Sequence, residues 1–465
     1  MHFTSITAAA AIALALVAGD ANAHMGKGVP HNFKVREVIK PGSGIMTAAK
    51  RAATAAAAAP SITNEQSEEQ LKSQTEECEA YNYPGISDIK ANFPTVWQTA
   101  ELVQGDTQAS QVWDSIQKSG IIPADVKQKG TGGKGDFSSV TPTYPASDPD
   151  CWYEYHKCVT PKHKGLNPDI WQCPEPETWG LTFDDGPNCT HNKFYDFLKE
   201  NNQKATLFYI GSNLLDWPAQ GQRGLSDGHH ICVHTWSHQY MTQLTNDQVF
   251  AELYYTGKAI KDILGITARC WRPPYGDVDD RVRAIAQGLG MSTNVWSDDT
   301  EDWQIQPQGT LPTSAIVQNY NSIINQNYDT HGNIVLTHEI NADTMNEMMQ
   351  MYPTIKKHFK NIVPITACMN ETNPYPESIT FPNFADYTAG KISPANIPDM
   401  NNFKISSATY SPLAVATQTG STVGSNGQLS TGPKKTSGAS PTAALNNWTA
   451  VSCGIFAILG FLLVA

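Results

Sequence analysis

Acidic and imidazole side chains stand in two short runs whose spacing suits a catalytic metal site. Asp184 and Asp185 are adjacent at the end of the apolar run Leu181–Phe183, and the Gly-Pro that follows forces a turn. His234 and His238 are four residues apart, so one helical turn would place both rings on one face. Asp185 and the two histidines would supply one oxygen and two nitrogen ligands. Three protein ligands with open positions are typical of catalytic zinc.

The second carboxylate of the pair has a use of its own. While one aspartate binds a metal, its neighbour can take a proton from water whose pKa the metal has lowered toward neutrality. Taken alone, Asp-Asp-Gly-Pro is also an ordinary turn, and a chance His-x-x-x-His pair is common. The two runs together in one domain favour the metal site.

The segments around these residues alternate between strand and helix patterns. Short apolar runs predict buried strands at 180–183, 205–210, 230–233, 292–296 and 333–336. Amphipathic spacing predicts helices at 193–201, 247–264 and 280–290. This alternation indicates an α/β domain with a parallel sheet, although it does not separate a barrel from an open sheet.

Five motifs in one order resemble the polysaccharide deacetylases of carbohydrate esterase family 4, and most closely the fungal chitin deacetylases. They are Leu181-Thr-Phe-Asp-Asp-Gly-Pro187, His234-Thr-Trp-Ser-His238, Arg272-Pro-Pro-Tyr-Gly276, Asp299-Thr-Glu-Asp-Trp303 and Leu336-Thr-His-Glu339. The matched stretch runs from Cys173 to Cys368. The resemblance implies a distorted (β/α) barrel with the motifs at the strand ends. We expect a disordered N-terminal flank and a Ser/Thr-rich C-terminal flank around it.

The same resemblance implies roles for the first three motifs. Asp184 would be the general base and contact the substrate, and Asp185, with His234 and His238, would bind zinc or cobalt. Arg272 would orient Asp184 and keep it ionised, since its fork of donors suits a carboxylate. The backbone N–H of Tyr275 would face a developing oxyanion.

The last two motifs would supply the acid and the acetyl pocket. His338 follows an apolar strand and is the expected general acid, because an amide hydrolase must protonate a poor leaving nitrogen. Asp299 and Asp302 both fit as the carboxylate that holds its ring. Trp303 and Leu336 would surround the acetyl methyl. The expected reaction is hydrolysis of N-acetyl groups of chitin, which yields chitosan and acetate.

Other functions are compatible with parts of the same pattern. Acetylated xylan and peptidoglycan are processed by relatives with the same core. A wall mannoprotein that only binds chitin would need neither Asp184 nor His338. A serine hydrolase is disfavoured because the chain has no Gly-x-Ser-x-Gly elbow. A glycosidase using Asp184 and Asp299 would not need the histidine pair.

The two ends of the chain predict secretion and a lipid anchor. Residues 1–23 have an apolar centre and close on Ala21-Asn22-Ala23, the pattern of a signal peptide. Residues 439–465 form a removable GPI signal with an uncharged apolar end, and attachment is expected at Ser437 or Gly438. A tail-anchored helix is the alternative. We expect the protein at the outer leaflet of the plasma membrane and in the cell wall.

Composition divides the remainder of the chain into three parts. Residues 24–145 are expected to be a low-complexity accessory region, with short helices between Ser67 and Trp113. The catalytic domain is expected at 146–375. Residues 376–438 are rich in Ser, Thr, Pro, Gly and Asn and predict a disordered stalk.

Cysteines and sequons agree with a secreted protein. Of nine cysteines, Cys453 lies in the tail, and the even remainder suggests disulfides. Cys173 and Cys368 bracket the motifs and are expected to pair, as in fungal relatives. Cys151 with Cys158, and Cys78 with the core, are further candidates. Glycosylation is expected at Asn188 and Asn370; because a glycan at Asn188 would crowd the site, Asn188→Gln should leave activity intact or raise it.

The charge balance bears on partners. A net charge of −12 argues against nucleic acid or an anionic membrane as a partner. Chitin is neutral, so charge contributes little to its capture, whereas a deacetylated product is cationic. We expect a monomer.

Overall fold

A parallel sheet surrounded by helices forms the centre of the protein. The computed structural model describes residues 62–412. The predicted signal peptide, the GPI attachment residues Ser437 and Gly438, and the removable tail all lie outside this range. No helix within it is long and apolar enough to cross a membrane.

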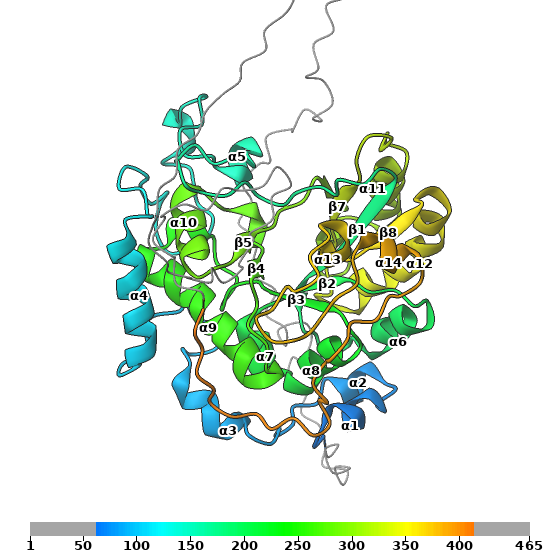
Figure 1. The fold of residues 1–465 in the computed structure, drawn as a ribbon. Helices are drawn as coiled ribbons and strands as arrows, with labels where there is room; N and C mark the ends of the chain where they lie inside the picture. Colours follow the sequence, from blue (N-terminus) through cyan, green and yellow to red (C-terminus); the bar gives the residue numbers. More distant parts are fainter. Residues whose placement is uncertain (1–61, 413–465) are drawn as a thin grey trace, which may run out of the picture. The chain divides into compact units, whose positions relative to one another are not determined.

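The sheet has eight strands in the order β5-β4-β3-β2-β1-β7-β6, and β8 also pairs with β1. The strands are β1 Thr178–Gly186, β2 Thr206–Tyr209, β3 His230–Val233, β4 Cys270–Trp271, β5 Ser292–Thr293, β6 Asp298–Asp299, β7 Asn333–Leu336 and β8 Asn361–Val363. Every ladder between them is parallel. The expected distorted (β/α) barrel is confirmed as a half-barrel of parallel strands, with helices outside it (Figure 1).

The helices fall into three groups along the chain. Before the sheet come α1 Glu65–Glu69, α2 Gln74–Glu77, α3 Ile86–Ile89, α4 Thr107–Ser119 and α5 Tyr153–His156. Between the strands come α6 Asn192–Glu200, α7 Gly211–Asp216, α8 Pro218–Ser226, α9 Asn246–Leu264, α10 Asp280–Gly288, α11 Thr313–Ile324 and α12 Ala342–His358. Last come α13 Ile365–Cys368 and α14 Phe384–Thr388. The predicted strands and helices all correspond to elements of this set.

Local sequence explains the long helix α9. Thr245 and Gln248 form a reciprocal capping box at its start, and Gly265 ends it with φ of 77°. Most of its residues are buried, including Glu252. The helix therefore lies inside the molecule, where its polar side chains need partners.

The N-terminal region departs from the expectation of a disordered flank. Residues 62–145 contain α1–α4, and Ile89, Phe93, Trp113 and Ile116 belong to the main hydrophobic core. In Figure 1 this segment, in blue, runs along α8 and α9. The apolar residues of this segment follow no clear helical or strand period, yet they pack into the core of the catalytic domain. Composition alone therefore did not predict that the segment is folded.

The stalk predicted at 376–438 overlaps a folded segment, because the chain remains packed beyond residue 376. Phe381, Tyr387, Ile405 and Tyr410 are buried, and the Tyr410 hydroxyl lies where a Cβ on Gly257 of α9 would be. The segment up to residue 412 is thus part of the folded unit. Its apolar side chains are widely spaced in a polar sequence, and that spacing concealed their burial.

Disulfides join the parts of the described chain. The predicted pairs Cys173–Cys368 and Cys151–Cys158 are present. Cys78 bonds Cys189, which attaches the N-terminal helices to the loop after β1 as expected. A fourth bond, Cys232–Cys270, joins β3 to β4 and was not predicted.

Candidate active site

The motif residues gather at the carboxyl ends of neighbouring strands. Asp184 and Asp185 end β1, His234 follows β3, Arg272 follows β4 and His338 follows β7. In a parallel sheet these ends meet at one edge, which is where α/β proteins commonly bind ligands. Residues of four motifs thus meet at this edge of the sheet, in which β1 lies between β2 and β7.

Asp185, His234 and His238 form a compact group of potential metal ligands. The carboxylate oxygen Oδ1 of Asp185 lies 3.3 Å from His234 Nε2 and 3.0 Å from His238 Nε2. The three ligand atoms lie within 4.8 Å of one another, and all three residues are buried. Oδ1 of Asp185 is buried and faces both ring nitrogens. An oxygen and two ring nitrogens that converge in this way fit a divalent cation.

The outer nitrogens of both rings are also engaged. His234 Nδ1 lies 2.9 Å from the Arg272 carbonyl oxygen, to which it donates. His238 Nδ1 lies 3.1 Å from the Tyr275 hydroxyl. Partners on Nδ1 orient a ring and leave Nε2 free to bind a metal. Both rings therefore present the ligand nitrogen to Asp185.

Burial alone would raise the pKa of Asp185. The neighbouring His238, with hydrogen bonds from both histidines, instead holds this pKa well below its usual range. The carboxylate is therefore ionised at neutral pH, as a metal ligand must be.

A bulge in β1 explains how adjacent aspartates serve one site. Pairing with β2 shifts register between Asp184 and Gly186, and Asp185 between them has φ of 70°. Neighbouring residues of a regular strand point to opposite faces, whereas a bulge redirects one of them. Oδ2 of Asp184 consequently lies 3.8 Å from His234 Nε2, on the same side as Asp185.

Arg272 fixes the other oxygen of Asp184. Its fully buried guanidinium donates from Nη1 to Asp184 Oδ1 at 2.8 Å and to Thr182 Oγ1 at 2.8 Å. It also lies over the Phe208 ring, 4.2 Å from the centroid. The predicted contact between Arg272 and Asp184 is therefore present in the structure.

His338 lies beside Asp184 because Asp184, within β1, pairs in parallel with His338, two residues beyond the end of β7. Asp302 holds this histidine twice, through Oδ1 on ring Nδ1 at 2.6 Å and through Oδ2 on the backbone N–H at 2.8 Å. Burial alone would lower the pKa of His338, but the Asp302 carboxylate outweighs it, and Asp185 and Asp184 add to the effect. The resulting pKa is about 9.

Of the two aspartates left open by the sequence, Asp302 is the one in contact with the His338 ring. Asp299 lies in β6, next to the strand that precedes His338, and its Oδ1 accepts the N–H of Glu301. Asp302 reaches the histidine because η5, Asp302–Gln304, turns the chain back. The spacing of the two aspartates in the sequence could not predict this turn.

The predicted substrate-contacting residues occupy the same edge. Tyr275 has φ of 60°, which is unusual for a residue with a side chain, and its ring stacks on Tyr240 at 3.8 Å. Leu336 ends β7 and is buried, and Trp303 lies in η5 next to Asp302. Backbone strain of the kind seen at Tyr275 is common at functional sites.

The two predicted glycosylation residues differ sharply. Asn370 is exposed. Asn188 is 5% exposed, its Nδ2 donates to the Ile340 carbonyl at 2.7 Å, and Cys189 beside it is oxidised. A glycan would replace one hydrogen of this buried Nδ2, where the folded chain leaves little room, and glycosylation of Asn188 stays a prediction. In the folded protein the side chain joins the loop after β1 to the loop after His338.

Sequence reasoning missed Glu252 on α9. This buried carboxylate accepts the N–H groups of Trp236 and Ser237, which lie between the two histidines of the metal group. The signal for it was a lone glutamate within the apolar run Val249-Phe-Ala-Glu-Leu253. A charged residue in such a run needs buried partners.

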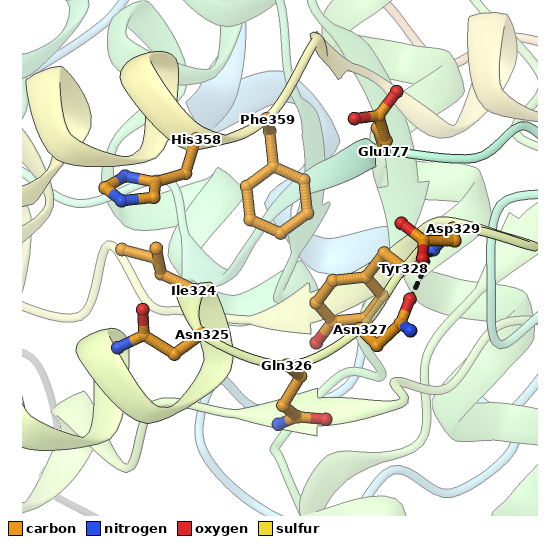
Figure 2. Close-up of a pocket in the computed structure, with 9 residues that line it drawn as sticks. All are labelled: Glu177, Ile324, Asn325, Gln326, Asn327, Tyr328, Asp329, His358 and Phe359. Atoms are coloured by element: carbon orange, nitrogen blue, oxygen red, sulfur yellow. Dashed lines mark hydrogen bonds between the residues drawn. The ribbon is translucent and has the colours of Figure 1, made fainter.

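A separate cavity of about 340 Å³ lies at the opposite end of β1 (Figure 2). It is lined by Glu177, which precedes β1, and by Tyr328 and Phe359, whose ring centroids are 5.2 Å apart. It contains none of the motif residues. The reacting groups are therefore at the other end of the strand.

Comparison with known proteins gives a consistent result. The polysaccharide deacetylase profile matches residues 172–293. Chitin deacetylase 2 of Cryptococcus neoformans var. grubii is 50% identical over 393 residues, which are 83% of this chain and 82% of that protein. The chitin deacetylase of Amylomyces rouxii is 44% identical over 324 residues, 68% of this chain and 75% of that protein.

Proposed function

The chain belongs to the polysaccharide deacetylase family, and from this premise we propose that it removes acetyl groups from the N-acetylglucosamine residues of chitin. The observation that carries the proposal is that two groups of reactive side chains lie next to each other at one edge of the sheet. Asp184 lies beside the ligand group Asp185, His234 and His238. His338, whose ring contacts Asp302, pairs through its backbone with Asp184. The names and the extent of the similar proteins support chitin as the substrate.

The ligand group would hold a divalent cation, zinc or cobalt. When bound there, such an ion lowers the pKa of water and polarises an acyl oxygen. The donor set of one carboxylate and two imidazoles supports this assignment, as does the convergence of both ring nitrogens on Oδ1 of Asp185. The second-nitrogen contacts of His234 and His238 would keep the rings in place.

The remaining residues would carry the proton transfers. Asp184, which accepts a hydrogen bond from Arg272, would take a proton from the attacking water while the water oxygen bonds to the acetamide carbon. The Tyr275 N–H would stabilise the charge that develops on the carbonyl oxygen. His338 would give a proton to the nitrogen as the C–N bond breaks, which releases acetate and a free amine. Its Nδ1 is bound to Asp302, so Nε2 would deliver the proton.

Trp303 and Leu336 would form the apolar surface for the acetyl methyl. Both flank the His338–Asp302 pair, since Trp303 follows Asp302 and Leu336 lies two residues before His338. Asp184 would contact the substrate at the same point. A methyl group buried there would place the carbonyl between the base and the acid.

The ends of the sequence support a proposal about location. A signal peptide, a stalk and a GPI signal would place the mature protein at the plasma membrane and in the cell wall as a monomer. Attachment would occur at Ser437 or Gly438, and Asn370 would carry an N-glycan. Release of the protein from cells by a phosphatidylinositol-specific phospholipase would test the anchor; retention after complete lipid cleavage would contradict it.

Acetate release from chitin oligomers tests the function. We expect the purified protein to release acetate, to lose this activity with a chelator and to regain it with zinc or cobalt. Asp184→Asn should abolish release while it leaves the metal content unchanged. Release from acetylated xylan but not from chitin would overturn the substrate assignment, and chelator-resistant release would overturn the metal role.

A further inference from the structure

The loop that carries both histidines of the proposed metal group has a strained backbone. Thr235 has φ of 65° and His238 has φ of 56°, so two non-glycine residues of the five lie in the left-handed region. Such conformations persist only where the surroundings hold them. The loop His234–His238 therefore depends on groups outside it.

Glu252 of α9 supplies the first of these groups. Its Oε2 accepts the N–H groups of Trp236 and Ser237, both at 2.8 Å. Its Oε1 accepts the Ser237 hydroxyl at 2.6 Å and the Ala100 N–H at 2.8 Å. One fully buried carboxylate thus connects the histidine loop to the N-terminal region.

The N-terminal segment Phe93–Ala100 supplies the others. The Phe93 ring stacks on Trp236, with centroids 5.6 Å apart and planes 4° from parallel. The Trp236 indole N–H donates to the Thr95 carbonyl at 3.1 Å. The indole is therefore fixed on its face and at its edge by the same short segment.

A further connection passes through Ser212 at the start of α7. Its hydroxyl accepts the Trp97 N–H at 2.9 Å and donates to the Trp236 carbonyl at 2.6 Å. Trp236 is thus held at its ring, its N–H and its carbonyl. All the holding groups lie outside the five-residue loop itself.

We propose that Phe93–Ala100 and Glu252 together form a clamp that sets the metal affinity of the site. A loop already ordered in its ligand conformation binds an ion without first losing freedom, so its affinity is higher. The segment precedes residues 172–293, to which the family profile is matched. The inference rests on the proposed metal site and gives the N-terminal region a role in it.

The test compares two aromatic residues of the N-terminal region. Phe93→Ala removes the stack on Trp236. Trp113→Ala is the matched control, because Trp113 is equally buried and packs on Phe250 of α9, away from the histidine loop. Zinc dissociation constants of the metal-free proteins would be measured by competition with a chromophoric chelator, beside cobalt absorption spectra and unfolding temperatures.

We expect Phe93→Ala to raise the zinc dissociation constant by about tenfold or more, the usual effect of losing a group that orients ligands. Its cobalt spectrum should change as well. Trp113→Ala should lower the unfolding temperature while it leaves the dissociation constant and the spectrum as in the natural protein. Equal losses of affinity in both variants, or none in Phe93→Ala, would overturn the clamp.

Two further variants keep the outcomes separate. Glu252→Gln keeps the side-chain volume but replaces one acceptor by a donor, and Phe93→Leu keeps the apolar bulk. Each should weaken zinc binding, and they take the place of Phe93→Ala in the test if that variant does not fold. Unchanged affinity in both would overturn the clamp. His234→Ala should abolish binding in any case. Failure of the natural protein itself to bind zinc or cobalt would count against the proposed metal site.

Discussion

At the scale of single residues, the environment of His338 decides how it can act. Asp302 contacts both its ring and its backbone, and the pKa of about 9 keeps the ring protonated through neutral pH. A general acid must begin the reaction protonated, so activity should persist until the pH exceeds this pKa. A bound cation nearby would lower the pKa somewhat, because like charges repel.

Asp302→Asn should therefore change the pH profile as well as the rate. Without the carboxylate the pKa of His338 falls, and the alkaline limb of kcat/KM should move to lower pH. Asp299→Asn is the control on the same segment and should leave that limb in place. Profiles of acetate release between pH 5 and about 10 would check this; an identical shift in both variants would contradict the assignment of Asp302.

Arg272 makes a second prediction at this scale. Its Nη1 contacts Asp184 and Thr182 while the planar group lies over Phe208. An ammonium is a point charge and cannot keep these three contacts at once. Arg272→Lys should lower kcat by about 100-fold, as expected for a misplaced base, with metal content unchanged. Single-turnover rates and metal analysis would test this; an unchanged rate would show that the base needs only a positive charge.

At the scale of elements, Asn188 connects the loop after β1 to the loop after His338. Its Nδ2 donates to the Ile340 carbonyl, two residues beyond His338, and its Oδ1 accepts from the Thr190 N–H. The sequence had suggested a glycan here and an activity that survives Asn188→Gln. With the side chain buried in a hydrogen-bond network, we now expect the reverse.

Asn188→Ala should destabilise the protein by about 1–3 kcal/mol, because a buried carbonyl loses its donor. Activity should fall with it as the His338 loop loosens. Chemical denaturation and acetate release would measure both, and Thr190→Ala, which breaks the sequon but leaves the bond to Ile340, is the control. If Asn188→Ala is as stable as the natural protein and has lost the mass of a glycan, the prediction that Asn188 is glycosylated would be supported instead.

The bond Cys232–Cys270 acts at the same scale. It joins β3 and β4 two residues before His234 and Arg272, which contact each other through Nδ1 and a carbonyl. The disulfide therefore holds together the two strands that precede His234 and Arg272. Each strand end is thereby fixed to its neighbour on the side where the reaction would occur.

At the scale of the whole molecule, the N-terminal helices are docked through buried acids. Glu68 of α1 is fully buried, and burial, opposed by Arg223 and Asn192, raises its pKa to about 7 from 4.5. An acid with a raised folded pKa contributes most to stability when protonated. That contribution is present below pH 4.5, falls as the pH rises toward about 7, and stays lost above it.

Glu68→Gln should therefore stabilise the protein at pH 8 relative to the natural chain and have little effect near pH 4. Glu69→Gln is the control for a change of the same charge on α1, since Glu69 pairs with Lys199 at the surface. Thermal unfolding of the three proteins at both pH values would decide. A difference that does not depend on pH would contradict the buried-acid explanation.

The sequence by itself determined the types of reactive side chain and the positions of the longer buried strands. Residue types at close spacing predicted the ligand group, and the resemblance of the motifs to a known family predicted the base and the acid. Apolar runs predicted the buried strands that deliver them. Short strands such as β4 and β6 carry too few residues for a pattern and were found only in the structure.

Only the tertiary structure decided which residues hold the catalytic groups in place. The choice of Asp302 over Asp299 depends on a turn, the shared orientation of Asp184 and Asp185 depends on a bulge, and Glu252 depends on helix packing. The order of residues 62–145 and 376–412 depends on isolated side chains that insert into a distant core. These are contacts between residues far apart in the chain, and local spacing contains no record of them.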